Sequence, residues 1–127
     1  MKRVIGLGGI FFKCKDHETV KDWYQKHLGI PVEPWGALFP WRRHDKPQEE
    51  TYSVWSPFKE DTTYFQPGEQ EYMINYQVED LSALLETLKK EGVTVLEKTE
   101  ESEFGKFGWI IDPEGRKIEL WEPPKNT

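Results

Sequence analysis

The spacing of apolar residues in the first half of the chain predicts a strand followed by an amphipathic helix. Val4–Cys14 is rich in β-branched and aromatic residues, which favours a strand. Asp16 is a good N-cap for the helix that follows, and Gly29 is suited to end it. The residues expected on the apolar face of this helix are Val20, Trp23, His27 and Leu28.

Three further strands are predicted before the middle of the chain. They cover Ile30–Glu33, Ala37–Arg42 and Thr51–Trp55, with a polar loop before the last of them. A linker is expected over 58–71, because this stretch mixes charges of both signs and contains the turn-forming pair Pro67-Gly68.

The second half repeats the order of the first. Tyr72–Val78 predicts a strand, Asp80 caps a helix and Gly92 ends it. Four leucines at helical spacing mark the buried face of this helix: Leu81, Leu84, Leu85 and Leu88. Three more extended segments follow, namely Val93–Glu97, Gly105–Ile111 and Arg116–Trp121.

The repeat, with an offset of about 65 residues, predicts an α+β fold made of two βαβββ modules. Module 1 covers 1–57 and module 2 covers 72–124, and the whole of 1–127 forms a single domain. Each module alone is too small to bury its sheet. Two modules side by side, from one chain or exchanged between two subunits, are expected to form a U-shaped mixed sheet with helices on one face and a concave cleft on the other.

Composition excludes several classes of function. The formal net charge of −6 argues against a nucleic-acid partner, because phosphate backbones require a basic surface. No apolar run is long enough to cross a membrane, and the first residues lack the apolar core of a signal peptide. The single cysteine, Cys14, cannot form an internal disulfide, which fits a cytoplasmic protein.

The end of the chain carries a family signature. Trp109-Ile110-Ile111-Asp112-Pro113-Glu114-Gly115-Arg116-Lys117-Ile118-Glu119-Leu120, together with the repeat, resembles the vicinal-oxygen-chelate superfamily. This superfamily contains glyoxalase I, bleomycin-resistance proteins and extradiol dioxygenases. The resemblance covers nearly the whole chain and implies the glyoxalase-like fold described above, while leaving the activity open.

Enzymes of that superfamily hold a divalent metal at four equivalent strand positions. Two of these precede the helix-capping aspartates by seven residues, and the other two lie on the final strand of each half. In this chain the four positions are Gly9, Ser53, Met73 and Glu119. Only Glu119 has a side chain suited to a hard divalent cation. The sequence therefore predicts no metal and no other cofactor.

Strand alternation assigns a cleft face to each strand. The face includes Gly9, Phe11 and Lys13 on the first strand, with Ser53 and Trp55 later in module 1. In module 2 it includes Met73, Asn75, Gln77, Glu119 and Trp121. Two positions are open for the arginines of Trp41-Arg42-Arg43, one pointing into the cleft and one on the surface. The candidate ligand-binding residues are Phe11, Trp41, Arg42, Ser53, Trp55, Met73, Asn75, Trp109, Glu119 and Trp121.

The favoured hypothesis is metal-independent binding or sequestration of a small molecule, similar to that of bleomycin-resistance proteins. Glu119 and the acidic balance favour a cationic aromatic ligand, which would pair with Glu119 and stack on Trp55 and Trp121. The alternative is a lyase, isomerase or dioxygenase of the glyoxalase type with a rearranged site, in which Glu119 is the general base or a metal ligand. A domain without a ligand is the third possibility. We also expect a homodimer, because so aromatic a small chain needs a partner to cover its surface.

Overall fold

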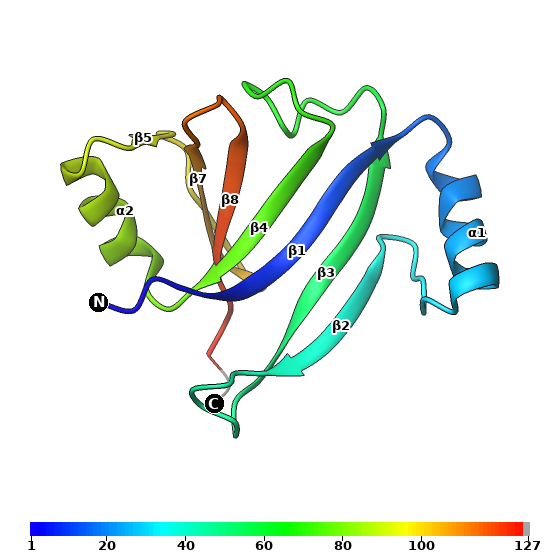
Figure 1. Cartoon of the computed structure of the whole chain (residues 1–127), viewed down its shortest axis with the longest axis horizontal. Helices are drawn as coiled ribbons and strands as arrows, with labels where there is room; N and C mark the ends of the chain where they lie inside the picture. The colour runs from blue at the N-terminus through cyan, green and yellow to red at the C-terminus, as the bar shows by residue number, and fades with distance from the viewer. Residues whose placement is uncertain (126–127) are drawn as a thin grey trace.

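The computed structural model describes residues 1–125 and has a single mixed sheet with two helices (Figure 1). In chain order the elements are β1 (Val4–Cys14), α1 (His17–Leu28), β2 (Ala37–Arg42), β3 (Glu50–Lys59), β4 (Tyr72–Val78), α2 (Leu81–Lys90), β5 (Thr94–Val95), β6 (Glu100–Ser102), β7 (Gly105–Ile111) and β8 (Lys117–Glu122).

The two halves of the chain join along β1 and β4. The strand order is β2-β3-β1-β4-β8-β7-β5, and β6 pairs with β7 beside this path. β1 is parallel to β3 and antiparallel to β4, and β4 is parallel to β8. α1 and α2 lie at opposite ends of the curved sheet (Figure 1). The α+β, U-shaped, glyoxalase-like architecture predicted from the repeat is confirmed.

Both helices begin at their predicted caps. The carboxylate of Asp16 accepts a hydrogen bond from the Thr19 N–H at 3.1 Å, and that of Asp80 accepts one from the Ala83 N–H at 3.1 Å. Gly29 ends α1 with a φ of 69°, a left-handed conformation that glycine adopts at little cost.

Two strand predictions for the N-terminal half are corrected. Ile30–Glu33 forms no strand, and this part of the chain has only an isolated bridge between Glu33 and Gly36. Pro31 and Pro34 explain the difference, because each lacks the N–H that a ladder requires. The strand expected at Thr51–Trp55 is longer and runs from Glu50 to Lys59.

The buried core consists of two clusters on opposite faces of the sheet. On the helix face, Leu81, Leu84 and Leu85 of α2 pack against Val78 and Leu120. On the cleft face, the cluster consists of Phe11, Phe65, Met73 and Trp109. By contrast, Lys21 is the only fully buried residue of α1. Within residues 1–125, neither helix is long and apolar enough to span a membrane.

Candidate functional site

Glu119 lies at the centre of the cleft face of β8. Its neighbours in the sheet are Asn75 of β4 and Trp109 of β7, which are aligned with it on either side. The residue is only 1% exposed. Alternation explains its direction, because Ile118 and Leu120 of the same strand pack against α2.

Three donors surround the carboxylate of Glu119. Oε1 accepts hydrogen bonds from the Tyr64 hydroxyl and, at 3.0 Å, from Trp109 Nε1. Oε2 accepts one from Asn75 Nδ2 at 2.5 Å. Both oxygens are therefore occupied by groups of the protein itself.

Tyr64 reaches Glu119 from the segment that connects the two halves, residues 60–71. Its neighbour Phe65 is 0% exposed and belongs to the cleft cluster with Phe11, Met73 and Trp109. The ring of Phe58 lies 5.6 Å from that of Tyr64 and 5.4 Å from that of Phe65. The connecting segment thus fills the cleft at the level of Glu119.

Burial dominates the electrostatics of this cluster. It raises the pKa of Glu119, while the donors Tyr64, Asn75 and Trp109 oppose the rise. The pKa of Tyr64 is raised by its own burial and by the neighbouring charge of Glu119. The positive charge of Lys117 also opposes the rise in the pKa of Glu119, and burial lowers the pKa of Lys117 itself.

Lys117 is held by the connecting segment as well as by its own strand. Its Nζ donates to the backbone oxygen of Tyr64 at 2.7 Å and lies 5.1 Å from the centre of the Tyr64 ring. The same ammonium is 5.2 Å from the ring centre of Trp109. Cation–π contacts therefore replace a direct ion pair with Glu119.

The structure brings together five of the candidate residues predicted from the sequence. Phe11, Met73, Asn75, Trp109 and Glu119 meet around Tyr64 and Phe65. These five side chains therefore share the cleft face, and a role in ligand binding stays a prediction.

Trp121, a sixth candidate, lies farther along the cleft face of β8. Its ring is 5.4 Å from that of Tyr52 on β3 and stacks on Phe107 at 6.0 Å. Since β3 and β8 are separated in the sheet by β1 and β4, the contact between Tyr52 and Trp121 joins the two arms of the U.

The cleft-face prediction for β3 is wrong by one residue. The ring of Trp55 lies 5.4 Å from Phe12 and 5.1 Å from Tyr24 of α1, so it belongs to the helix face. Ser53 shares that face; its hydroxyl accepts from Trp41 Nε1 at 2.8 Å and donates to the Leu7 carbonyl at 2.5 Å.

The reason for this error lies in the strand register. Phe11 aligns with Ser56 as Asn75 aligns with Glu119. Phe11 and Asn75 each stand five residues before the aspartate that caps the following helix. Ser56, rather than Ser53, is therefore the N-terminal counterpart of Glu119.

Neither arginine of the β2–β3 hairpin enters the filled part of the cleft. Arg42 is paired with Glu50 at 3.2 Å on the surface. Arg43 is buried and reaches Asp45 at 2.8 Å, and Glu49 and Glu79 at 3.4 Å. This network holds the hairpin against the end of β4, and Arg43 lowers the pKa of Asp45 to about 2.

Tyr64 and Phe65 lie in the stretch that is predicted to be a linker, so neither is among the site residues expected from the sequence. A signal was present, since two adjacent aromatic residues interrupt a segment of otherwise polar composition. Two adjacent aromatic residues in a loop indicate that the loop packs against another part of the protein, because large apolar side chains are more stable when buried. In this structure they pack against the cleft face of the sheet.

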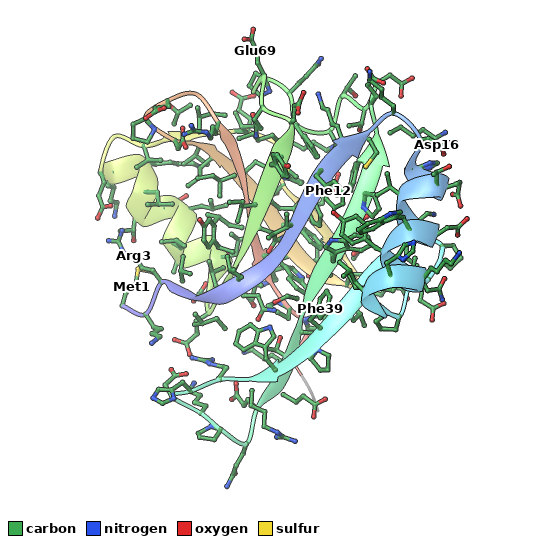
Figure 2. The ribbon with its side chains drawn as sticks, turned by 45° about the vertical axis from the view of Figure 1, so that its right-hand side comes forward. Met1, Arg3, Phe12, Asp16, Phe39 and Glu69 are labelled. Carbon is green, nitrogen blue, oxygen red and sulfur yellow. The ribbon has the colours of Figure 1, made fainter. Side chains whose placement is uncertain are left out.

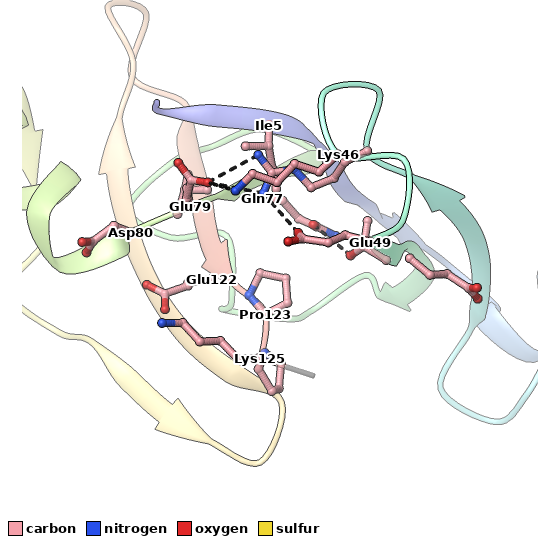
Figure 3. Close-up of a pocket in the computed structure, with 14 residues that line it drawn as sticks. Ile5, Lys46, Glu49, Gln77, Glu79, Asp80, Glu122, Pro123 and Lys125 are labelled. Carbon is pink, nitrogen blue, oxygen red and sulfur yellow. Dashed lines mark hydrogen bonds and ion pairs between the residues drawn. The ribbon is translucent and has the colours of Figure 1, made fainter. Parts of the chain in front are cut away.

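An open pocket of about 620 Å³ lies at the end of the cleft, beyond this filled part (Figure 3). The ends of β4 and β8, the hairpin loop and the C-terminal segment surround it. Gln77 of β4 and Thr51 of β3 contribute to its wall and bond to each other at 2.9 Å. Five carboxylates and three cations line it: Glu49, Glu50, Glu79, Asp80 and Glu122, with Arg43, Lys46 and Lys125.

The residues at the superfamily's metal positions do not fit a divalent metal. Gly9 offers no donor atom, Met73 offers a soft thioether, and the hydroxyl of Ser56 donates to the Trp35 carbonyl at 2.7 Å. Both oxygens of Glu119 already accept hydrogen bonds. No cluster of three or more His, Cys, Asp or Glu suited to a metal lies within residues 1–125.

Solved structures of similar fold include methylmalonyl-CoA epimerases and a glyoxalase. A methylmalonyl-CoA epimerase from Streptomyces coelicolor superposes with a TM-score of 0.70 at 16% identity, covering 96% of this chain and 99% of that one. The methylmalonyl-CoA epimerase from Mycobacterium tuberculosis gives 0.63 at 20% identity, with 96% and 90% covered.

A Mn(II)-bound glyoxalase from Novosphingobium aromaticivorans gives a TM-score of 0.60 at 15% identity, covering all of this chain and 43% of that one. These identities establish the fold alone. No curated protein sequence matches the chain. The model of the glyoxalase-like domain matches residues 9–121. The chain therefore belongs to the glyoxalase-like domain family of the vicinal-oxygen-chelate superfamily.

Proposed function

We propose that the protein binds a small cationic molecule, without a metal, in the open pocket at the end of its cleft. The observation that carries this proposal is the pocket itself, a space of about 620 Å³ with five carboxylates against three cations in its wall. A volume in this range accommodates a drug-sized molecule.

The charges of the pocket are not equally available to a ligand. Arg43 is committed to Asp45, Glu49 and Glu79, and Lys46 pairs with Glu79 at 3.0 Å. These two cations therefore attract an anion only weakly.

Glu122 is the carboxylate best placed to meet a cation. Its Oε1 accepts from the Leu81 N–H at 2.8 Å, and Oε2 has no partner among residues 1–125. A cationic group at Oε2 would form the charge-assisted contact that the pocket lacks. The neighbouring Asp80, whose Oδ1 caps α2, adds to the negative potential.

This proposal moves the ligand away from Glu119. The sequence suggested that Glu119 would pair with a cationic ligand directly, with Trp55 and Trp121 stacking on it. In the structure Glu119 is enclosed by its three donors, and Trp55 lies on the helix face. A ligand reaches Glu119 only if Tyr64 leaves its position.

Calorimetric titration with a matched set of probes tests the proposal. Benzamidine, benzamide and benzoate have similar shape and carry a positive, zero and negative charge. We expect benzamidine to bind most tightly and Glu122→Gln, which keeps the acceptor for Leu81, to weaken it about tenfold, or 1.4 kcal/mol. Glu103→Gln is the control, because Glu103 is exposed and outside the pocket.

The same titration examines metal independence. Dialysis against EDTA and subsequent addition of Zn²⁺ or Mn²⁺ should leave the affinity for benzamidine unchanged. The proposal would be contradicted if the protein bound benzoate more tightly than benzamidine. It would also be contradicted if Glu122→Gln and Glu103→Gln bound benzamidine with equal affinity.

Proton transfer at Glu119 is the second candidate function. The raised pKa of Glu119 favours it, since a carboxylate in an apolar site is a stronger base than one in water. Solved relatives include methylmalonyl-CoA epimerases, so methylmalonyl-CoA is the natural probe. If methylmalonyl-CoA incorporates deuterium from D₂O with the unmodified protein but not with Glu119→Gln, the result supports catalysis of proton transfer and counts against a purely binding role.

We also propose that the protein forms a homodimer and acts in the cytoplasm, as expected from its aromatic content and its lone cysteine.

A further inference from the structure

The face of the sheet beside α1 is covered by aromatic side chains that are not buried. The ring of Phe12 lies 5.4 Å from Trp55, 6.5 Å from Tyr24 and 6.3 Å from Tyr72. Figure 2 shows Phe12 at this position on β1, near α1. Trp23 extends the group through a contact of 5.2 Å with Tyr24. We call this group, together with Ile10 and Ile74, the aromatic face.

No residue of the aromatic face is fully buried. Trp23 is 51% exposed, Tyr72 60%, Ile10 39% and Ile74 37%. The equivalent face beside α2 is different, because three leucines of α2 are buried there against Val78 and Leu120. The two halves share one architecture, but only the C-terminal half has a complete core on its helix face.

The aromatic face is continuous across the join between the halves. Ile10 aligns with Ile74, and Phe12 aligns with Tyr72, on the central strands β1 and β4. Since aligned residues of an antiparallel pair share a face, these four side chains form one apolar surface. It runs from the middle of the sheet to α1.

The solvent-accessible area of the chain is larger than that of a typical monomer of the same mass, as expected if a partner covers part of it. The chain exposes 8495 Å² at a mass of 15.1 kDa. A folded monomer of this mass typically exposes about 7,100 Å², so the excess is about 1,400 Å². A stable protein–protein interface covers about 800 Å² on each partner. The excess is therefore sufficient for one such interface.

The charges of α1 are compatible with a second copy of this chain as the partner. The chain carries a net charge of −6, so two copies repel one another on average and can meet only at a locally neutral surface. α1 is neutral, with Glu18 and Asp22 balanced by Lys21 and Lys26. A two-fold interface sets one surface against itself, so the neutral α1 adds no net repulsion between two copies at this place.

We infer that the aromatic face is the surface through which two copies of this chain form a dimer. This inference rests on the homodimer proposed above and adds the residues that build it. It is independent of the ligand pocket, because none of the residues of the aromatic face lines that pocket.

Sedimentation equilibrium over the micromolar range tests the inference with three variants. The unmodified protein should be a dimer. Tyr72→Arg should give a monomer, because it places a charge where the interface excludes water, and an exposed position tolerates arginine without loss of fold. Ile74→Arg should act in the same way. Phe104→Arg is the control, since Phe104 is 60% exposed outside the aromatic face, and it should remain dimeric.

Circular dichroism and thermal unfolding of each variant establish that the fold is retained. A monomeric unmodified protein would overturn both the homodimer and the aromatic face as its interface. If Tyr72→Arg and Ile74→Arg fold and remain dimeric, the dimer stands and the aromatic face is excluded. Loss of the dimer in Phe104→Arg alone would move the interface to the β6–β7 turn.

Discussion

Tyr64 donates a hydrogen bond to Glu119 across 55 positions of sequence. The bond joins the segment between the two halves to the last strand of the sheet, inside the cleft. Glu119 is the one side chain at the superfamily's metal positions that could bind a hard cation, and here it receives hydrogen bonds instead. The connecting segment thus contacts the one carboxylate that the resemblance to the superfamily assigns to a metal position.

Tyr64→Phe removes the hydroxyl of this bond and little else. We expect the free energy of unfolding to fall by about 1.5–3 kcal/mol, the usual value of a hydrogen bond to a charged group. Urea unfolding measures the change. Tyr76→Phe is the matched control, because Tyr76 is half-buried beside the leucines of α2 and its hydroxyl has no partner among residues 1–125. Equal losses in the two variants would show that the Tyr64 hydroxyl has no special role.

Local signals in the sequence predicted most of the fold. The N-caps Asp16 and Asp80 and the helix ends at Gly29 and Gly92 depend on residues within one helical turn, and all four are confirmed. β1, β2, β4 and β7 also have their predicted bounds. These features need no knowledge of distant contacts.

The candidate site was less predictable, because its contacts are long-range. Strand alternation alone predicted Ser53 and Trp55 on the cleft face of β3, whereas the hydrogen-bond register with the neighbouring strand decides which side chains share a face. The position of Tyr64 depends on how residues 60–71 fold back over the sheet. No periodicity within that segment encodes this path.

Phe65→Ala tests whether the connecting segment is a structural part of the cleft. Phe65 is 0% exposed among Phe11, Met73 and Trp109, so truncation leaves a cavity. We expect a loss of about 3–5 kcal/mol in the free energy of unfolding. Phe104→Ala, at a 60% exposed position, should cost far less. If both variants are equally stable, Phe65 is not held in the cleft in solution.

The last prediction concerns the pH dependence of stability and Glu119. Burial raises the pKa of Glu119 above its usual value of 4.5, so the folded state binds more protons than the unfolded state above that pH. Stability contributed by Glu119 is therefore complete below pH 4.5 and is lost as the pH rises through the folded-state pKa. Glu119→Gln removes this titration.

Urea unfolding of both proteins between acidic and neutral pH measures the effect. The stability of the unmodified protein minus that of Glu119→Gln should decrease as the pH rises from 4.5. Its steepest slope should be about 1.4 kcal/mol per pH unit, since a single group titrates. Other carboxylates, such as Asp45, contribute to both proteins and cancel in the difference. A difference that increases with pH would mean that Tyr64, Asn75 and Trp109 stabilise the carboxylate by more than its burial costs, and that the pKa of Glu119 is lowered.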